Sequence, residues 1–227
     1  NVNGYQAAKL RVYQDMLDAT SNGSTNYVTS PFMWNLLGVK YILSKEDMGV
    51  PPIYKSEKTG TQVIYNPNFF PNAFFIDTLE IAKNVDILMH LRNQDFNPRK
   101  KAYLMSALNQ TIDLPSQEDS AIVTKYANEN IIYKVNSSGN CFLLLNEVYY
   151  PDWKAYLDGK EIPIYQTNYF MRGVVIPKGN HNLELKFYSQ EFETGKTLSL
   201  ASNILLALLL ILSIFFEMRN KKKQLNE

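Results

Sequence analysis

Aromatic and charged side chains gather in residues 149–172, where they could contact a sugar. Exposed aromatic rings stack against the apolar faces of pyranose rings, while carboxylate and guanidinium groups bond to hydroxyls or phosphate. The aromatic members are Tyr149, Tyr150, Trp153, Tyr156, Tyr165, Tyr169 and Phe170. Trp153 and Tyr169 border predicted turns, and Asp152 and Arg172 supply charge nearby. These four residues are the candidate contacts for a sugar or an acceptor.

The alternative for the same aromatic residues is a structural one. Aromatic side chains are enriched in β-strands, where they fill the space between a sheet and its neighbours. Packing in a core is therefore the favoured interpretation for the group as a whole. Trp153 and Tyr169 are the expected exceptions, because a side chain at a turn has more access to solvent.

The sequence predicts no catalytic residue and no metal ligand. His90 and His181 are the two histidines and Cys141 is the one cysteine, so an intramolecular disulfide is excluded and a zinc site would have few ligands. His90 is expected to be a structural or surface residue, and Asp158 is explained by a turn with Gly159. A net charge of +1 gives no reason to expect nucleic acid as a partner.

Turn chemistry and alternation predict the strands that position the aromatic segment. The Asp158-Gly159 pair predicts a two-residue turn between strands at 154–157 and 160–164. Residues 172–176 and 182–187 are expected to form a second hairpin around the sequence PKGN. The run 141–145 is apolar throughout, which is typical of a central strand covered on both faces.

The remaining patterns complete a mainly β fold, an antiparallel sandwich or meander with a small α-helical lead segment. A hairpin is predicted from strands 121–127 and 131–135, which flank Asn128, Glu129 and Asn130. Further strands are expected at 39–43, 62–65, 73–76 and 101–105. Helices are expected at 5–19, 31–37 and 84–91, with Ser30 and Asn84 as N-caps.

The C-terminal residues predict a transmembrane helix. Residues 197–216 carry no formal charge, and such a helix covers about 30 Å, the hydrocarbon thickness of a bilayer. Arg219 and Lys221 to Lys223 follow it, and the positive-inside rule assigns them to the cytoplasm. Residues 1–195 are therefore expected to be extracytoplasmic.

Four segments follow from these observations. They are a helical lead segment with one strand at 1–48, an extracytoplasmic β-sandwich-like domain at 49–194, a transmembrane helix at 195–217 and a basic cytoplasmic tail at 218–227. The chain begins at Asn1 without a signal peptide although its head is expected to be exported. We therefore expect it to be the C-terminal part of a longer membrane protein.

Several segments resemble one protein family in the same order. They are GYQAAKLRVYQDMLD, NLLGVKYIL, FPNAFFID, DFNPRKKAYL and the run from Tyr149 to Phe187, which is followed by a glycine and a terminal hydrophobic helix. Together they resemble the YfhO family of bacterial multi-spanning membrane proteins. The most specific part is the spacing of Pro151, Trp153 and Asp158-Gly159-Lys160. Asp152 stands where that family often has glycine.

The resemblance implies a protein of the bacterial cytoplasmic membrane that is similar to C-superfamily glycosyltransferases. Such proteins transfer a sugar from a polyprenyl-phosphate donor to a glycan, lipid or polymer acceptor outside the membrane. A general base deprotonates the acceptor, and a divalent metal or basic groups steady the departing phosphate. The resemblance places the catalytic acidic residue in the first outer loop of the upstream transmembrane domain. The implied partners are that domain, the bilayer and the acceptor.

Two functions remain open at this point. The chain is either the outer domain and last span of such a sugar transferase, or a membrane-anchored β-sandwich module that binds a glycan or a partner protein without chemistry. The first predicts many upstream spans with an acidic residue in the first outer loop. The second predicts a signal peptide or a single span.

Overall fold

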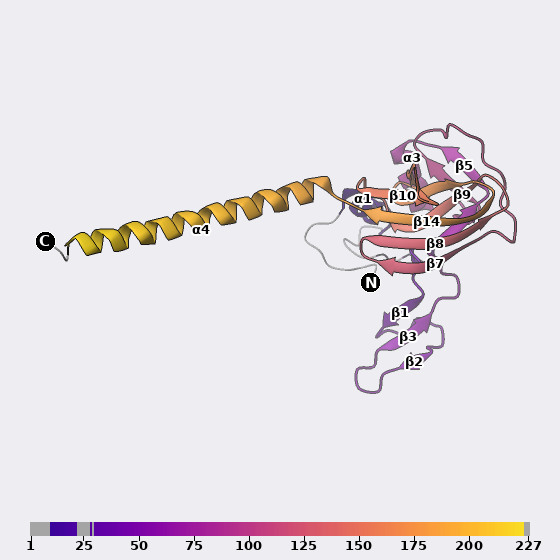
Figure 1. The fold of residues 1–227 in the computed structure, drawn as a ribbon. Coiled ribbons are helices and arrows are strands. Elements are labelled where there is room, and N and C mark those ends of the chain that lie inside the picture. The colour runs from indigo at the N-terminus through magenta and orange to yellow at the C-terminus, as the bar shows by residue number, and fades with distance from the viewer. Residues whose placement is uncertain (1–9, 22–27, 29, 225–227) are drawn as a thin grey trace. The chain divides into compact units, whose positions relative to one another are not determined.

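The computed structural model describes residues 10–21, 28 and 30–224, and most of the described chain is β structure. Three sheets, three short helices and one long C-terminal helix make up the described part (Figure 1). The expected mainly β fold with a few N-terminal helices and a long apolar C-terminal helix is confirmed. Residues 1–187 and 188–227 form two separate compact units, which are described in turn.

The larger unit is built around a six-stranded sheet, called the inner sheet here. Its strands, in spatial order, are β4 (Ala73–Ile76), β9 (Cys141–Val148), β13 (Met171–Ile176), β12 (Tyr165–Thr167), β6 (Lys101–Leu104) and β5 (Thr78–Ile81). Neighbouring strands are antiparallel except for the parallel pair β5 and β6. All five residues of the apolar run 141–145 are buried in β9, as the sequence predicts.

A five-stranded sheet, called the outer sheet, packs on one face of the inner sheet. Its strands, in spatial order, are β11 (Lys160–Ile162), β10 (Trp153–Leu157), β14 (Gly179–Phe187), β8 (Asn130–Ser137) and β7 (Ser120–Ala127). Leu143 and Val174 of the inner sheet share a buried cluster with Tyr133, Leu183 and other residues of the outer sheet. This cluster is the core of the sandwich.

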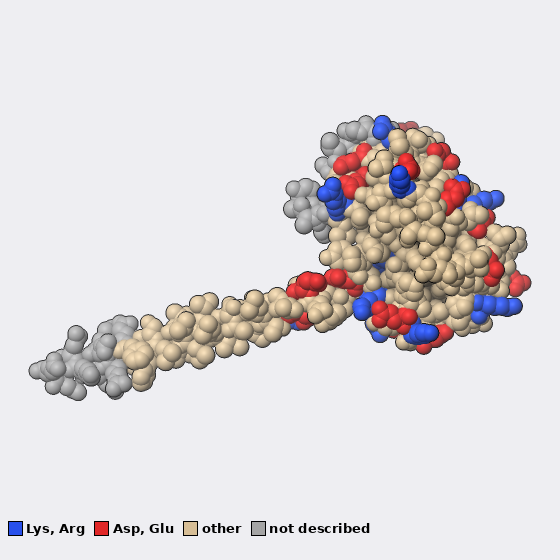
Figure 2. Space-filling model, turned by 90° about the horizontal axis from the view of Figure 1, so that it is seen from above, with Lys and Arg blue, Asp and Glu red and all other residues tan. Residues whose placement is uncertain are grey.

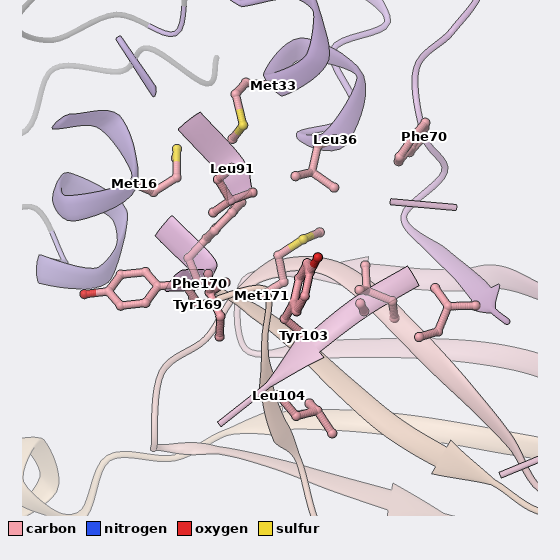
Figure 3. Packing of buried hydrophobic residues seen from close by; sticks show 14 of the residues in the cluster. Met16, Met33, Leu36, Phe70, Leu91, Tyr103, Leu104, Tyr169, Phe170 and Met171 are labelled. Carbon is pink, nitrogen blue, oxygen red and sulfur yellow. The ribbon is translucent and has the colours of Figure 1, made fainter. Parts of the chain in front are cut away.

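Three helices share a second buried cluster with the opposite face of the inner sheet. They are α1 (Arg11–Thr20), α2 (Pro31–Leu36) and α3 (Asn84–Asn93). Met16, Met33 and Leu91 of these helices pack in one cluster with Phe142 and Tyr103 of the inner sheet (Figure 3 shows part of it). The inner sheet is therefore covered on both faces. The predicted division of the chain at residue 48 stays a prediction.

The helix ends follow the expected signals in part. Ser30 is the N-cap residue of α2, Pro31 is its first residue, and Gly38 with φ +68° follows its end. In α3 the prediction was off by one position, because Lys83 is the N-cap residue and Asn84 already lies in the helix. The predicted start of the first helix at 5–9 lies outside the described residues.

The turn signals predict two hairpins correctly and one wrongly. Asp158 and Gly159 have φ values of +50° and +86° between β10 and β11, and β7 pairs with β8 as expected. The expected hairpin of 172–176 with 182–187 is wrong. These residues lie in β13 and β14, which belong to different sheets. Every residue of β13 is buried, so this strand suits the sheet that is covered twice, whereas β14 alternates.

A third, small sheet has the strand order β1 (Tyr41–Ser44), β3 (Gln62–Tyr65) and β2 (Tyr54–Lys55). Figure 1 shows it as a projection beside the two larger sheets. The Asn66 side chain donates hydrogen bonds of 2.8 Å to Asn35 Oδ1 and to the Val39 carbonyl. These bonds fix the end of β3 to the last turn of α2 and to the segment that follows it.

The second unit contains helix α4 (Gln190–Gln224). Residues 190–216 form a stretch of 27 residues, which corresponds to about 40 Å at about 1.5 Å per residue. Figure 2 shows an uncharged surface along most of this helix. Within the described part of the chain, α4 is the one helix that is long and apolar enough to cross a membrane.

Candidate functional site

The structure brings two of the four candidate residues into direct contact. Trp153 begins β10 in the outer sheet, and Arg172 lies in β13 of the inner sheet. The Arg172 guanidinium carbon lies 4.1 Å from the centre of the Trp153 ring. This cation–π contact joins the two sheets where β10 begins, and we call its surroundings the Trp153–Arg172 cluster.

Two further aromatic residues extend the cluster toward solvent. The Phe187 ring at the end of β14 lies 5.5 Å from the Trp153 ring and 5.9 Å from the Tyr150 ring, measured between centroids. Trp153 is half-buried and Tyr150 is 37% exposed. The outermost aromatic surface of the cluster therefore belongs to Tyr150 and to the open part of Trp153.

Arg172 is held as a buried cation. Its side chain is 3% exposed, its Nε donates a 2.9 Å hydrogen bond to the Val148 carbonyl, and its buried Nη1 has no hydrogen-bond partner among the described residues. Burial lowers the pKa of Arg172 to about 10, against the opposing effect of the Glu147 charge. Arg172 remains charged at neutral pH.

A hydrogen-bonded pair lies beside this cation and also links the two sheets. Tyr126 of β7 donates a 2.6 Å hydrogen bond to Glu147 Oε1 of β9. Burial, followed by this bond, raises the pKa of Tyr126 to about 12. Burial also raises the pKa of Tyr133, whose buried hydroxyl has no hydrogen-bond partner among the described residues. Both phenols therefore stay protonated near neutral pH.

A bulge in β9 accounts for the position of Glu147. Met171 of β13 is opposite Val148, but the next residue, Arg172, is already opposite Leu145. Asn146 and Glu147 therefore have no partner in this register, and a bulge of this kind redirects side chains at the end of a strand. Sequence reasoning missed Glu147, Tyr126 and Tyr133. The available signal was the polar Asn146-Glu147 pair, which interrupts an apolar strand.

Asp152 and Tyr169 lie in different surroundings. Asp152 is half-buried in the turn just before Trp153. The expectation that Tyr169 is more open to solvent than the core is wrong, because it is 9% exposed and belongs to the buried cluster that contains the three short helices. Its hydroxyl lies 2.5 Å from Asp15 Oδ2 of α1 (Figure 3 shows the Tyr169 ring). Burial, followed by the bond to Asp15, raises the pKa of Tyr169 to about 12. The role of all four candidates as sugar contacts stays a prediction.

Tyr169 also has an unusual backbone conformation. Asn168 and Tyr169 have φ values of +47° and +71°, in the left-handed region that residues other than glycine seldom adopt. The Asn168 amide donates to the Tyr103 carbonyl at 2.9 Å, and Asn168 Oδ1 accepts from the Tyr103 amide at 2.8 Å. This double contact holds the turn against β6, and sequence reasoning missed it because it joins distant residues.

The histidines and acidic residues have structural partners. His90 stacks on Tyr103 at 4.6 Å and lies 2.8 Å from Asp95 Oδ1, and His181 Nδ1 lies 2.7 Å from Asp158 Oδ2. Asp158 Oδ1 also accepts a hydrogen bond from the Asn182 amide. Among the described residues, no group of three or more histidine, cysteine or acidic side chains could hold a metal ion. These residues therefore do not fit a divalent metal.

The geometry supports binding at the surface better than catalysis. A buried arginine covers one side of the Trp153 ring, and no nucleophile or general base is paired for chemistry within the cluster. What the cluster offers to a ligand is the outer surface of Tyr150 and Trp153, with Asp152 next to Trp153 in the chain. Aromatic surface and a single carboxylate suit the apolar and hydroxyl faces of a sugar.

Comparison with known proteins identifies one family. Residues 103–199 match the family described as bacterial membrane protein YfhO. The matched segment begins in β6, includes all residues of the Trp153–Arg172 cluster and ends within α4. Searches of curated proteins and of solved structures gave no match. Residues 103–199 of this chain are therefore similar to the YfhO family of bacterial membrane proteins.

Proposed function

We propose that this chain is the extracytoplasmic head and last span of a multi-pass protein of the bacterial cytoplasmic membrane. The protein transfers a sugar from a polyprenyl-phosphate carrier to a glycan, lipid or polymer of the cell envelope. The observation that carries the proposal is the YfhO match, which covers most of the sandwich and continues into the apolar helix α4. The basic residues after the span support an outer location for the head.

In this proposal the head does not carry out the chemistry. Sugar transfer from a phosphate carrier needs a base for the acceptor hydroxyl and positive charge at the departing phosphate. The one buried cation of the cluster, Arg172, stacks on Trp153 and has its Nη1 enclosed. The base and the phosphate-binding groups therefore belong to the transmembrane domain of the complete protein.

The head instead holds the acceptor. The exposed side of the Trp153–Arg172 cluster offers Tyr150, Trp153 and Asp152 to an incoming sugar. Arg172 and Phe187 fix the orientation of the Trp153 ring from behind, so a stacked sugar meets a surface that is already ordered. Order before binding lowers the entropic cost of the complex. Tyr169 is proposed as a second contact; it is 9% exposed and its hydroxyl is bonded to Asp15, so this role requires that bond to open.

The test is a Trp153→Ala variant of the complete protein, expressed in cells that lack the native gene. Transfer of a labelled sugar to the envelope is measured together with the amount of protein in the membrane. We expect transfer to fall several-fold while the amount is unchanged. The matched control is Tyr156→Ala, because Tyr156 is a half-buried aromatic residue of the same strand. Unchanged transfer in Trp153→Ala with normal folding contradicts the role of this surface.

The second candidate is a membrane-anchored module that binds a glycan or partner protein without chemistry. The observation in its favour is the open aromatic surface of Tyr150 and Trp153 next to the buried, enclosed Arg172, which suits binding. The two functions are separated with the complete protein in membrane vesicles supplied with labelled polyprenyl-phosphate sugar. Transfer to an acceptor supports the first, and glycan binding without any transfer supports the second.

A further inference from the structure

The small sheet has one face made of apolar and aromatic side chains. Directly opposite residues of paired strands point to the same face. Tyr41 pairs with Tyr65, and Val63 pairs with Leu43 on one side and Tyr54 on the other. These five residues, Tyr41, Leu43, Tyr54, Val63 and Tyr65, are called the tyrosine face. They contain no charged group.

The tyrosine face is open to solvent, whereas the opposite face of the sheet is buried on its central strand. Leu43 is 72% exposed, Tyr54 62%, Tyr41 52% and Tyr65 42%. On the other face, Ile64 and Gln62 are buried. Tyr41, Leu43 and the exposed Met48 also line a depression of about 840 Å³ along β1. Lys40 and Glu46 line the same depression, so its rim is charged. On the sheet itself the cross-strand pairs make the apolar side chains neighbours, and such surfaces mark interaction sites.

The residue types favour lipid over sugar as the occupant. A sugar platform needs aromatic rings with polar groups between them, but here Leu43 and Val63 lie between the tyrosines, and Ile53, Val50 and Met48 are exposed nearby. Aliphatic side chains beside tyrosine rings are typical of proteins at the boundary between acyl chains and headgroups. Lys40 lies beside the face, with its Nζ 5.6 Å from the Tyr41 ring centre, where an ammonium can extend to headgroups.

A bilayer is also the partner that the chain itself brings close. Helix α4 is long and apolar enough to cross a membrane, and residues 103–199 match a family of membrane proteins. Attachment to a bilayer gives the head a high effective concentration near lipid, so even a weak contact is occupied. We propose that the tyrosine face rests on the membrane interface and contacts headgroups and the outer part of the acyl chains.

Charge makes a small contribution to this contact. Residues 40–65 contain four lysines, Lys40, Lys45, Lys55 and Lys58, and three acidic residues, Glu46, Asp47 and Glu57. A net charge this small gives little attraction to anionic lipid. The contact is therefore expected to form on neutral bilayers as well as on anionic ones. It does not depend on sugar transfer.

The test uses nitroxide labels on the full chain reconstituted into phospholipid vesicles. Leu43→Cys and Tyr54→Cys place the label on the tyrosine face. The matched control is Ile122→Cys, because Ile122 is 63% exposed on the outer sheet. The native Cys141 is fully buried, so the introduced cysteine is the one expected to react. Accessibility to oxygen, which partitions into lipid, is compared with accessibility to a water-soluble nickel complex.

We expect the oxygen-to-nickel ratio at positions 43 and 54 to exceed that at position 122 several-fold, in neutral and in anionic vesicles. Equal ratios at all three positions show a face in water and overturn the proposal. Low accessibility to both reagents shows a protein partner, such as a second copy of the chain, and also overturns it. Lipid contact confined to anionic vesicles overturns the apolar mechanism. None of these readings depends on activity, so they are separate from the proposed sugar transfer.

Discussion

The guanidinium of Arg172 stacks on the ring of Trp153 at 4.1 Å, and this contact crosses from the inner sheet to the outer sheet. Beside it, the hydrogen bond from Tyr126 to Glu147 makes a second polar link between the same sheets. Elsewhere the sheets meet through apolar side chains. One end of the sandwich is therefore fixed by directional contacts, which keep the Trp153 ring in a defined orientation.

An Arg172→Lys variant tests this link. Lysine keeps the charge but lacks the planar guanidinium and the Nε that bonds to the Val148 carbonyl. We expect the head to lose about 1–3 kcal/mol of unfolding free energy. The measurement is thermal unfolding of the full chain in detergent, followed by tryptophan fluorescence.

The control for this variant is Lys186→Arg. Lys186 lies 5.2 Å from the Tyr156 ring in a more exposed position, so exchanging its cation is expected to change stability little. If Arg172→Lys unfolds at the same temperature as the parent chain, the buried guanidinium does not stabilise the end of the sandwich.

Sequence reasoning recovered the parts of this fold that local chemistry determines. The Asp158-Gly159 pair produced its turn because two consecutive positive φ values need such residues. The apolar run at Cys141 identified a strand covered on both faces, and the uncharged stretch in α4 identified a candidate membrane span. Each of these signals is contained within about twenty consecutive residues.

The parts that sequence reasoning missed depend on residues far apart in the chain. Alternation shows that 172–176 and 182–187 are strands, but it does not show which sheet each one joins. The Glu147 charge that acts on Arg172 is positioned by a bulge, and the Asn168 contact with Tyr103 spans 65 positions. The exposed tyrosine face was missed because its apolar residues lie on three short strands and become neighbours only when those strands pair.

A Gly173→Ala variant tests the packing beside Arg172. A Cβ atom at position 173 would lie 2.3 Å from Phe142 Cζ and 2.6 Å from Thr167 Oγ1, well inside van der Waals contact. Phe142 is fully buried and has little room to move. We expect a loss of about 3 kcal/mol or more, or failure to fold. The readouts are membrane yield and thermal unfolding.

Gly195→Ala is the matched control. Gly195 lies in α4 with no atom within 4 Å of the added Cβ, and alanine favours a helix. This variant is expected to be as stable as the parent chain. Normal yield and unfolding temperature for Gly173→Ala would contradict the close packing of the Phe142 ring over Gly173.

An Asp119→Asn variant tests a pH-dependent contribution to stability. Burial tends to raise the pKa of Asp119, but hydrogen bonds from Ser116 and Ser138 outweigh it, so the pKa is lowered overall. The backbone amides and hydroxyls of both serines donate to its two oxygens at 2.7–3.0 Å. Asparagine replaces one acceptor oxygen by a donor, so we expect a loss of about 1–2 kcal/mol at neutral pH.

The sign of the pH effect follows from the lowered pKa. Hydrogen bonds in the folded state stabilise the ionised carboxylate of Asp119 relative to the unfolded state. This stabilisation is complete above the pKa of an aspartate in the unfolded chain, about 3.9. It is lost as the pH falls through the lower folded pKa. The difference in unfolding free energy between the parent chain and Asp119→Asn should therefore become smaller in acid. Unfolding at pH 7 and pH 3 measures it, with Glu118→Gln as the exposed neighbouring control. A constant difference contradicts the assignment.

The orientation of α4 can be tested with two single-cysteine positions. Arg219 and Lys221 to Lys223 follow the apolar stretch, and basic residues beside a span favour the cytoplasmic side. We therefore expect Ile122→Cys in the head to react with a membrane-impermeant maleimide in intact cells, and Asn226→Cys to react only after the cells are opened. The buried Cys141 supplies the unreactive background. The reverse pattern would place the head in the cytoplasm, where an acceptor of the outer envelope cannot reach the Trp153–Arg172 cluster, so it would contradict the proposed function directly.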